Sequence, residues 1–263
     1  MNFLSKIFNK RANWAIPYAI FLVMFVALPL VMIVVYAFQD AEGNFSLNNF
    51  TRFIEQPEAL NTLIYSIGIA LVTTIICILL GYPAAWILAN RKLNRSEVTV
   101  ILFILPMWVN ILIRTLATVA LFDFIQTPLG EGALIFGMVY NYLPFMIYPI
   151  YNTLQKMDHS LIEAAEDLGA TPWEVFRKVT VPLSMPGVLS GIMMVFMPTI
   201  STFAIAELLT MNNVQLFGTT IQNNVNSGML NYGAALSLIM LIIIGVTSFF
   251  SGSDDSTDSE SII

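Results

Sequence analysis

The chain has 263 residues, of which 57% are apolar and only 11% are charged. This composition is far from that of a soluble globular protein and indicates an all-α protein that crosses a membrane several times. A single cysteine, Cys77, and a single histidine, His159, exclude a disulfide framework and a multi-histidine metal centre. We therefore expect no metal site, and the scattered acids suggest no catalytic constellation.

Six apolar stretches are long enough to span a bilayer as helices. The first is uncharged from Trp14 to Phe38 and is longer than the apolar core of a signal peptide, so we interpret it as a retained helix. The predicted spans cover about residues 14–38, 60–90, 98–122, 133–154, 187–206 and 232–250. They make residues 1–250 one transmembrane domain, and the Ser- and Asp-rich tail 251–263 is expected to be disordered.

Lysine and arginine are unevenly divided between the two sides of this topology. With the N-terminus inside, nine of the 11 basic residues fall in inner segments and only Arg52 falls in an outer one. The positive-inside rule therefore predicts cytoplasmic N and C termini and a cytoplasmic loop over residues 155–186. We expect a multi-pass protein of the cell membrane.

The polar loop carries two signatures of helix starts. Ser160 and Glu163 have the spacing of a capping box, and that helix is predicted to run to about Leu168 and to stop at Gly169. Thr171 and Glu174 form a second capping box, with Pro172 in the first helical position, and this helix is predicted to stop before Pro182. Both short helices carry apolar strips that need a partner.

Several residues within the spans suggest packing or a pathway. Gly187 and Gly191 have the spacing of a close helix crossing. Four prolines are expected to break spans: Pro106, Pro144, Pro149 and Pro198. Lipid tolerates a broken helix only where protein or a water-filled cavity satisfies the freed backbone groups.

Arg114 is a charge within the third span. One interpretation is a functional role. The alternative is structural: the side chain reaches the membrane–water interface or pairs with an acid of a neighbouring helix. Asp123 and Glu207 end two spans and offer carboxylates to a cation, while nearby aromatic faces suit an alkylammonium or belong to the interfacial belt.

Part of the loop resembles a known motif. Glu163, Ala164, Ala165, Gly169 and Pro182 match the spacing of the EAA loop of ABC importer permeases. That resemblance implies that the loop docks into a groove on a separate ATPase subunit; the alternative is a loop packed on its own membrane domain. The residues assigned to coupling are Glu163, Ala164, Ala165, Gly169, Trp173, Phe176 and Pro182.

Four further segments, Gly81–Trp86, Pro106–Arg114, Tyr142–Met146 and Leu161–Ala170, resemble the permeases of bacterial spermidine/putrescine importers. The resemblance implies a type I ABC importer permease fold, polyamine import and a bacterial inner-membrane location. It also implies a second, homologous permease, an ATPase dimer that binds ATP and magnesium, and an extracellular binding protein. The candidate pathway residues are Trp108, Asn110, Arg114, Asp123, Tyr148 and Glu207.

Alternative functions differ in what they require of this chain. None of the 14 glycines is followed by lysine, so the sequence has no Walker-type phosphate-binding loop, and if ATP drives transport another chain must bind it. A secondary transporter needs several intramembrane acids, which these spans almost lack, and a membrane enzyme needs a catalytic set. A role as an importer permease for another small solute remains an alternative, and nothing suggests a nucleic-acid partner.

Overall fold

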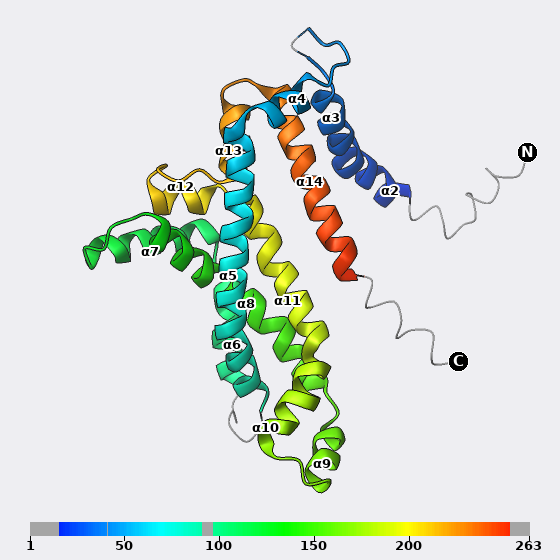
Figure 1. Ribbon diagram of the computed structural model, residues 1–263, viewed down its shortest axis with the longest axis vertical. Coiled ribbons are helices and arrows are strands. Elements are labelled where there is room, and N and C mark those ends of the chain that lie inside the picture. Colours follow the sequence, from blue (N-terminus) through cyan, green and yellow to red (C-terminus); the bar gives the residue numbers. More distant parts are fainter. Residues whose placement is uncertain (1–15, 41, 91–96, 253–263) are drawn as a thin grey trace, which may run out of the picture. The chain divides into compact units, whose positions relative to one another are not determined.

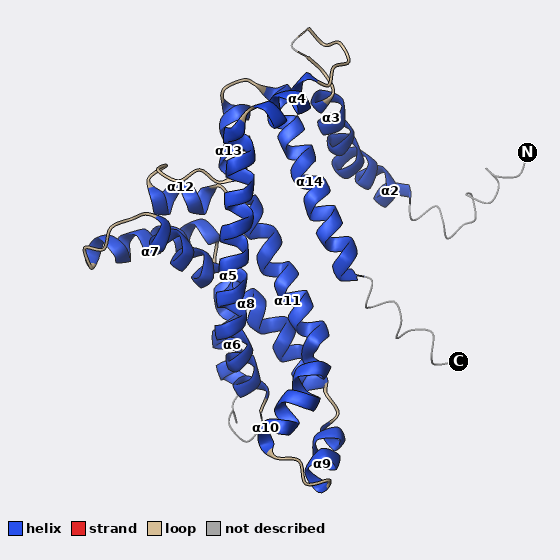
Figure 2. Cartoon of the chain, viewed as in Figure 1, coloured by secondary structure: helices blue, strands red, loops and turns tan. Residues whose placement is uncertain are grey.

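The computed structural model describes residues 16–40, 42–90 and 97–252. Over these residues the chain is helical almost throughout (Figure 2), and its β-structure is confined to one isolated bridge between Gln39 and Phe45. The chain divides into two compact units. One contains residues 1–57 and 221–242, and the other contains residues 58–220 and 243–263.

The smaller unit contains the first apolar stretch. Helix α2 (Ile16–Leu22), a π-helical turn (Val23–Ala27) and α3 (Leu28–Ala37) form one run of 22 residues whose side chains are largely uncovered by this chain. The short helix α4 (Asn48–Glu55) is held to the end of α3 because the Asn49 amide donates to the carbonyls of Ala37 and Gln39. The Arg52 guanidinium lies 4.3 Å above the Tyr232 ring.

Three long helices form the core of the larger unit: α5 (Pro57–Ala89), α8 (Glu131–Lys156) and α11 (Val181–Ser201) (Figure 1). Helix α8 is the most deeply buried of the spans, and its inward side chains are Leu134, Met138, Met146, Ile147 and Ile150. Gly187 and Gly191 bring α11 close to α8, since a Cβ atom at Gly191 would lie 2.7 Å from the Met146 sulfur. The predicted close crossing is confirmed.

The third predicted span is not one helix. Helix α6 (Glu97–Ile104) continues into a 3-10 turn (Leu105–Trp108), and α7 (Ile111–Phe124) then leaves at an angle of 96°. The break follows Pro106, and the Asn110 side chain caps α7 by accepting from the Leu112 amide at 2.8 Å. Pro106 therefore does break its span, as predicted, and Asn110 restarts the helix.

The other three predicted proline breaks are wrong, because Pro144 and Pro149 lie inside a continuous α8 and Pro198 lies inside α11. Each proline removes one backbone N–H donor from its helix. Nearby threonine hydroxyls donate to carbonyls of the same helices. The Thr153 hydroxyl donates to the Pro149 carbonyl at 3.0 Å, and the Thr199 hydroxyl donates to the Val195 carbonyl at 2.6 Å.

The fifth span also departs from its predicted bounds of 187–206. Helix α11 begins upstream at Val181 and ends at Ser201, and two residues then separate it from α12 (Ala204–Thr210). Helix α13 (Phe217–Asn226) follows, and α14 (Leu230–Gly252) contains the predicted sixth span. The predicted disordered tail lies outside the described residues except for Ser251 and Gly252, which end α14.

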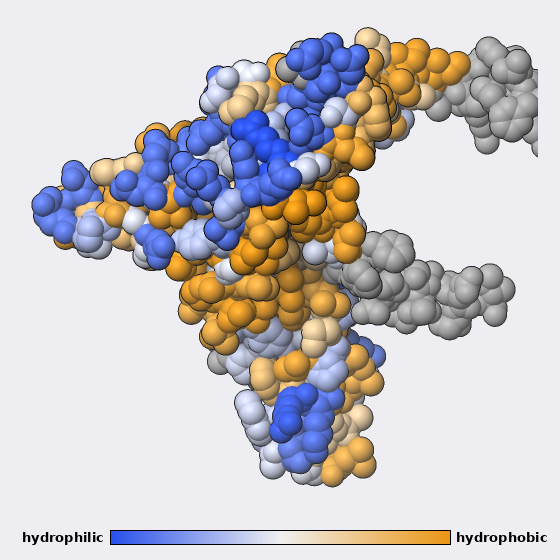
Figure 3. Space-filling view, turned by 45° about the horizontal axis from the view of Figure 1, so that its top comes forward, coloured by the Kyte–Doolittle hydropathy of each residue, from blue (hydrophilic) through white to orange (hydrophobic). Residues whose placement is uncertain are grey.

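Within the described residues, five helices are long and apolar enough to cross a membrane, and the bent pair of α6 and α7 brings the number to six. Figure 3 shows an apolar surface along the long helices and a polar surface at the end of the larger unit that carries the loop helices. The prediction of an all-helical protein with about six apolar spans is confirmed.

The close crossing of α8 and α11 generates a stability prediction. A Cβ atom at Gly187 would lie 2.5 Å from the Thr153 hydroxyl and 2.8 Å from the Pro149 carbonyl, whereas one at Gly68 meets nothing within 4 Å. Gly187→Ala should therefore destabilise the protein by about 1–3 kcal/mol through overpacking, and Gly68→Ala serves as the matched control. Thermal unfolding in detergent measures both, and equal midpoints would show that the crossing is not close.

Candidate coupling loop and translocation site

The first loop helix, α9 (His159–Asp167), begins earlier than predicted. Its cap is Asp158, whose side chain accepts from the Ser160 amide at 2.9 Å, so the predicted capping box of Ser160 and Glu163 is wrong. A carboxylate is a stronger acceptor than a hydroxyl at the positive end of a helix, which explains why the start moves to Asp158. Gly169 has a φ of 82° and ends the helix as predicted.

The second loop helix, α10 (Pro172–Val175), starts as predicted. The Thr171 hydroxyl accepts from the Glu174 amide at 3.4 Å, and the Glu174 carboxylate accepts from the Thr171 amide at 3.0 Å. The Thr171 amide, followed by Lys178 at 3.1 Å, lowers the pKa of Glu174, which lies in the polar loop, to about 2. This capping box therefore keeps its charge at any physiological pH.

The predicted stop before Pro182 is wrong. A π-helical turn (Phe176–Thr180) joins α10 to α11, and the Val181 amide donates to the Phe176 carbonyl in the wider pattern of this turn. Pro182 falls in the first turn of α11, where the absent amide is tolerated. The second loop helix is therefore continuous with a membrane span.

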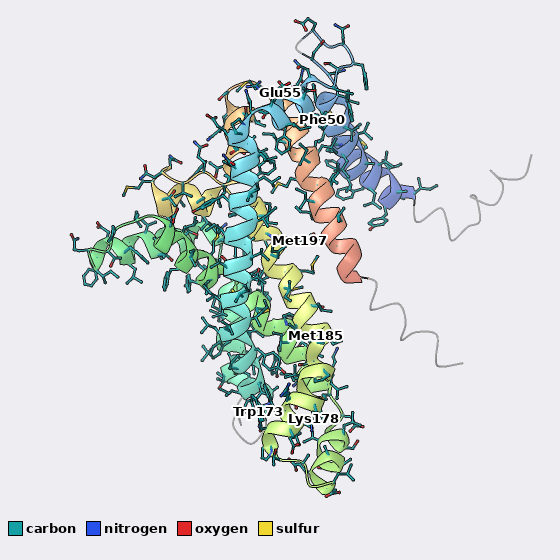
Figure 4. All side chains as sticks on the ribbon, viewed as in Figure 1. Phe50, Glu55, Trp173, Lys178, Met185 and Met197 are labelled. Carbon is teal, nitrogen blue, oxygen red and sulfur yellow. The ribbon has the colours of Figure 1, made fainter. Side chains whose placement is uncertain are left out.

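The large apolar side chains of the two loop helices meet different surroundings. Phe176 turns toward the membrane domain, where its ring makes edge contacts with Tyr82 and Trp86 at 5.9 and 6.0 Å. In contrast, Leu168 and Trp173 are 88% and 68% exposed. Figure 4 shows Trp173 and Lys178 together at the loop end of the unit. The loop is thus anchored through Phe176. Trp173, whose ring stacks on Phe176 at 5.6 Å, and Leu168 stay exposed.

A groove of about 450 Å³ separates the loop helices from the ends of α5 and α8. Trp86, Leu154 and Phe176 form apolar parts of its wall, and Glu163 and Glu166 contribute carboxylates from α9. Of the residues assigned to coupling, Glu163 and Ala164 are exposed, Ala165 and Phe176 are half-buried, and Gly169 forms the bend between the helices.

The candidate pathway residues are not gathered into one site. Trp108, at the bend between α6 and α7, is 88% exposed, and Asp123 is exposed near the end of α7. Tyr148 lies on α8, and Glu207 lies in the first turn of α12. No hydrogen bond or ring contact joins these four side chains within the described part of the chain. Three of the four lie on α7, α8 and α12, and Trp108 ends the 3-10 turn before α7.

Arg114 behaves differently from the other candidates. Its side chain is only 5% exposed, and its Nη1 donates to the Asn141 carbonyl of α8 at 3.2 Å. The Asn141 amide in turn donates to the Thr115 hydroxyl at 3.2 Å and to the Gly137 carbonyl at 2.9 Å. Sequence reasoning missed Asn141, although an uncharged polar residue in the middle of an apolar span is itself a signal.

Comparisons with known proteins agree with this architecture. Residues 77–253 match the family of binding-protein-dependent transport system inner membrane components. The chain is 34% identical to the spermidine/putrescine transport system permease protein PotB of Escherichia coli, over 86% of this chain and 90% of that protein. It is 31% identical to the PotB protein of Haemophilus influenzae, over 93% and 94% of the two chains.

Two solved structures share the fold. A chain from a bacterial ABC transporter involved in the import of alginate aligns with a TM-score of 0.69 and 16% identity, over 95% of this chain and 98% of that one. A chain from the MetNI methionine ABC transporter aligns with a TM-score of 0.60 and 16% identity, over 73% and 92%. The matched family and the shared architecture show that this multi-pass membrane protein belongs to the inner membrane components of binding-protein-dependent transport systems.

Proposed function

We propose that this chain is the transmembrane subunit of an ATP-driven importer that carries polyamines such as spermidine and putrescine into the cell. The observation that carries the proposal is the 34% identity to the E. coli PotB permease over 86% of the chain. The family supports partnership with an ATPase and a substrate-binding protein. The proposal also includes a second homologous permease and an ATPase dimer that holds ATP and magnesium. It places both termini in the cytoplasm and the chain in a bacterial inner membrane.

The loop geometry supports a coupling role. Helix α9 presents Glu163 and Ala164 outward, next to the exposed Leu168 and Trp173. Because α10 runs through a π-helical turn into α11, a force applied to the loop reaches a membrane span without passing through a flexible linker. The Phe176 contacts with Tyr82 and Trp86 carry the same force to α5. A separate ATPase that grips the loop would therefore move two spans together.

The chemistry of the candidate pathway residues also suits a flexible chain of ammonium groups. Such a cation needs acceptors spaced along its path, with apolar or aromatic walls between them. Asp123 and Glu207 supply carboxylates on α7 and α12, while Trp108, Asn110 and Tyr148 supply aromatic and amide surface. Their separation suits a pathway of weak sites better than a single tight site.

Another solute is the main alternative within the same family. The two structural neighbours come from transporters of methionine and of an acidic polysaccharide, so this fold accommodates very different cargoes. Secondary transport is less well supported, because it usually depends on several acids within the membrane spans and the apolar stretches of this sequence hold almost none.

The coupling role can be tested at Glu163 and Gly169. Glu163→Lys reverses an exposed charge of α9, and Gly169→Val places a β-branched residue at a φ of 82°. Both variants should reach the membrane but abolish solute-driven ATP hydrolysis and uptake by the reconstituted complex. Gly43→Val is the matched control, since Gly43 has a φ of 83° in another loop. Wild-type coupling in both loop variants would disprove the docking role.

The division of labour between subunits gives a second test. Purified alone and reconstituted, this chain should neither hydrolyse ATP nor take up solute, because none of its 14 glycines begins a Gly-Lys phosphate-binding pair. Uptake by the single chain under a proton or sodium gradient would instead establish a secondary transporter. The complete complex, assayed in the same lipid, controls for folding.

The polyamine assignment is tested by uptake of labelled spermidine and putrescine. Glu207→Gln and Asp123→Asn each remove one charge-assisted contact worth about 1.5–3 kcal/mol, which corresponds to about a ten- to hundredfold loss of apparent affinity. Glu58→Gln, on an exposed acid at the start of α5, is the matched control. A wild-type complex that carries neither polyamine overturns the substrate assignment, whereas wild-type behaviour of both variants overturns only the two sites.

A further inference from the structure

Arg114 occupies an electrostatically costly place. It is the fourth residue of α7, so its positive charge lies within the first turn, at the positive end of the helix dipole. It is also 95% buried, and no carboxylate contacts it among the described residues; the acceptor that it does have is the Asn141 carbonyl at 3.2 Å. A buried cation without an acid is a poor way to gain stability, so its presence points to a role in transport.

Asn141 completes a polar bridge between α7 and α8. Its side-chain amide donates to Thr115 of α7, and its backbone carbonyl accepts from Arg114 of the same helix. One residue further along α8, the Tyr142 hydroxyl donates to the Pro198 carbonyl of α11 at 3.4 Å. The bent arm α7 and the end of α11 are therefore held at the same level of α8.

The bridge is incompletely bonded, which gives it a second possible arrangement. Arg114 Nε is a buried donor and Asn141 Oδ1 is a buried acceptor, and neither has a hydrogen-bond partner. The two groups belong to residues that are already joined, because Arg114 Nη1 donates to the backbone carbonyl of Asn141. A shift of α7 along α8 that pairs Nε with Oδ1 would give both groups the hydrogen bond that they lack.

Helix α8 also connects this bridge to the coupling loop. It continues unbroken from Asn141 to Lys156, roughly 15 residues or about 22 Å of helix, and α9 follows within three residues. We propose that Arg114 and Asn141 are positioning residues that couple the angle of α7 to the movement of α8, and that they do not contact the solute. The inference uses the proposed importer function only for its transport measurement.

Transport kinetics of the complete importer in proteoliposomes provide the first test. Arg114→Met and Asn141→Leu should each lower the maximum uptake rate at least about tenfold while changing the half-saturating solute concentration by less than about twofold. Arg114→Lys, which keeps a charged donor, should recover part of the rate. Thr118→Val is the matched control, because Thr118 is buried on α7 but bonds only the Arg114 carbonyl of its own helix.

The second test measures the arm directly and does not depend on which solute is carried. Nitroxide labels at Phe124→Cys on α7 and Leu79→Cys on α5 occupy exposed positions. Arg114→Met should shift or broaden their distance distribution, and Thr118→Val should leave it unchanged. An unchanged distribution in Arg114→Met overturns the inference, as does a raised half-saturating concentration with an unchanged maximum rate, which would make Arg114 a solute contact. Failure of the polyamine assignment leaves the label measurement intact.

Discussion

The close packing of α8 against α11 is the contact on which the rest of the larger unit depends. Gly187 and Gly191 remove the side chains that would hold the two backbones apart, and the buried face of α8 then fills the space between α11 and α5. In a bilayer the helices gain little from the hydrophobic effect on meeting, so close van der Waals contact and interhelical hydrogen bonds have to hold them. Helices α8 and α11 supply both, because the Tyr142 hydroxyl bonds the Pro198 carbonyl.

This pair of helices also brackets the coupling loop. Helix α8 leads into α9, and α10 leads through the π-helical turn into α11, so the loop closes a continuous path between the two packed spans. The turn at Gly169 lets α9 and α10 change direction without a long linker. The exposed Leu168 and Trp173 leave apolar surface on this loop that this chain does not cover, which is what the proposed docking of an ATPase requires.

Local sequence rules succeeded where one residue type decides the outcome. The Thr171 cap, the Gly169 turn, the glycine crossing and the existence of apolar spans all follow from such residues. The rules failed where neighbouring groups compete. Asp158 competes with Ser160 for the start of α9, and α8 and α11 continue through Pro149 and Pro198 because the bonds of the surrounding turns outweigh one lost backbone donor. The 96° bend could not be predicted, because it depends on which surface α7 finds after Pro106.

Asn141, which was not singled out from the sequence, shows why candidate sites are harder to predict than spans. Charge made Arg114 conspicuous in the sequence, but its surroundings depend on a helix 27 positions away that contributes a backbone carbonyl. A carbonyl carries no sequence signature, so the acid partner that the sequence suggested for Arg114 is not what the described part of the fold provides. A buried cation that binds a carbonyl keeps its charge uncompensated. A change in the distance between α7 and α8 would break the hydrogen bond that holds Arg114, and this is the physical basis of the positioning role proposed for it.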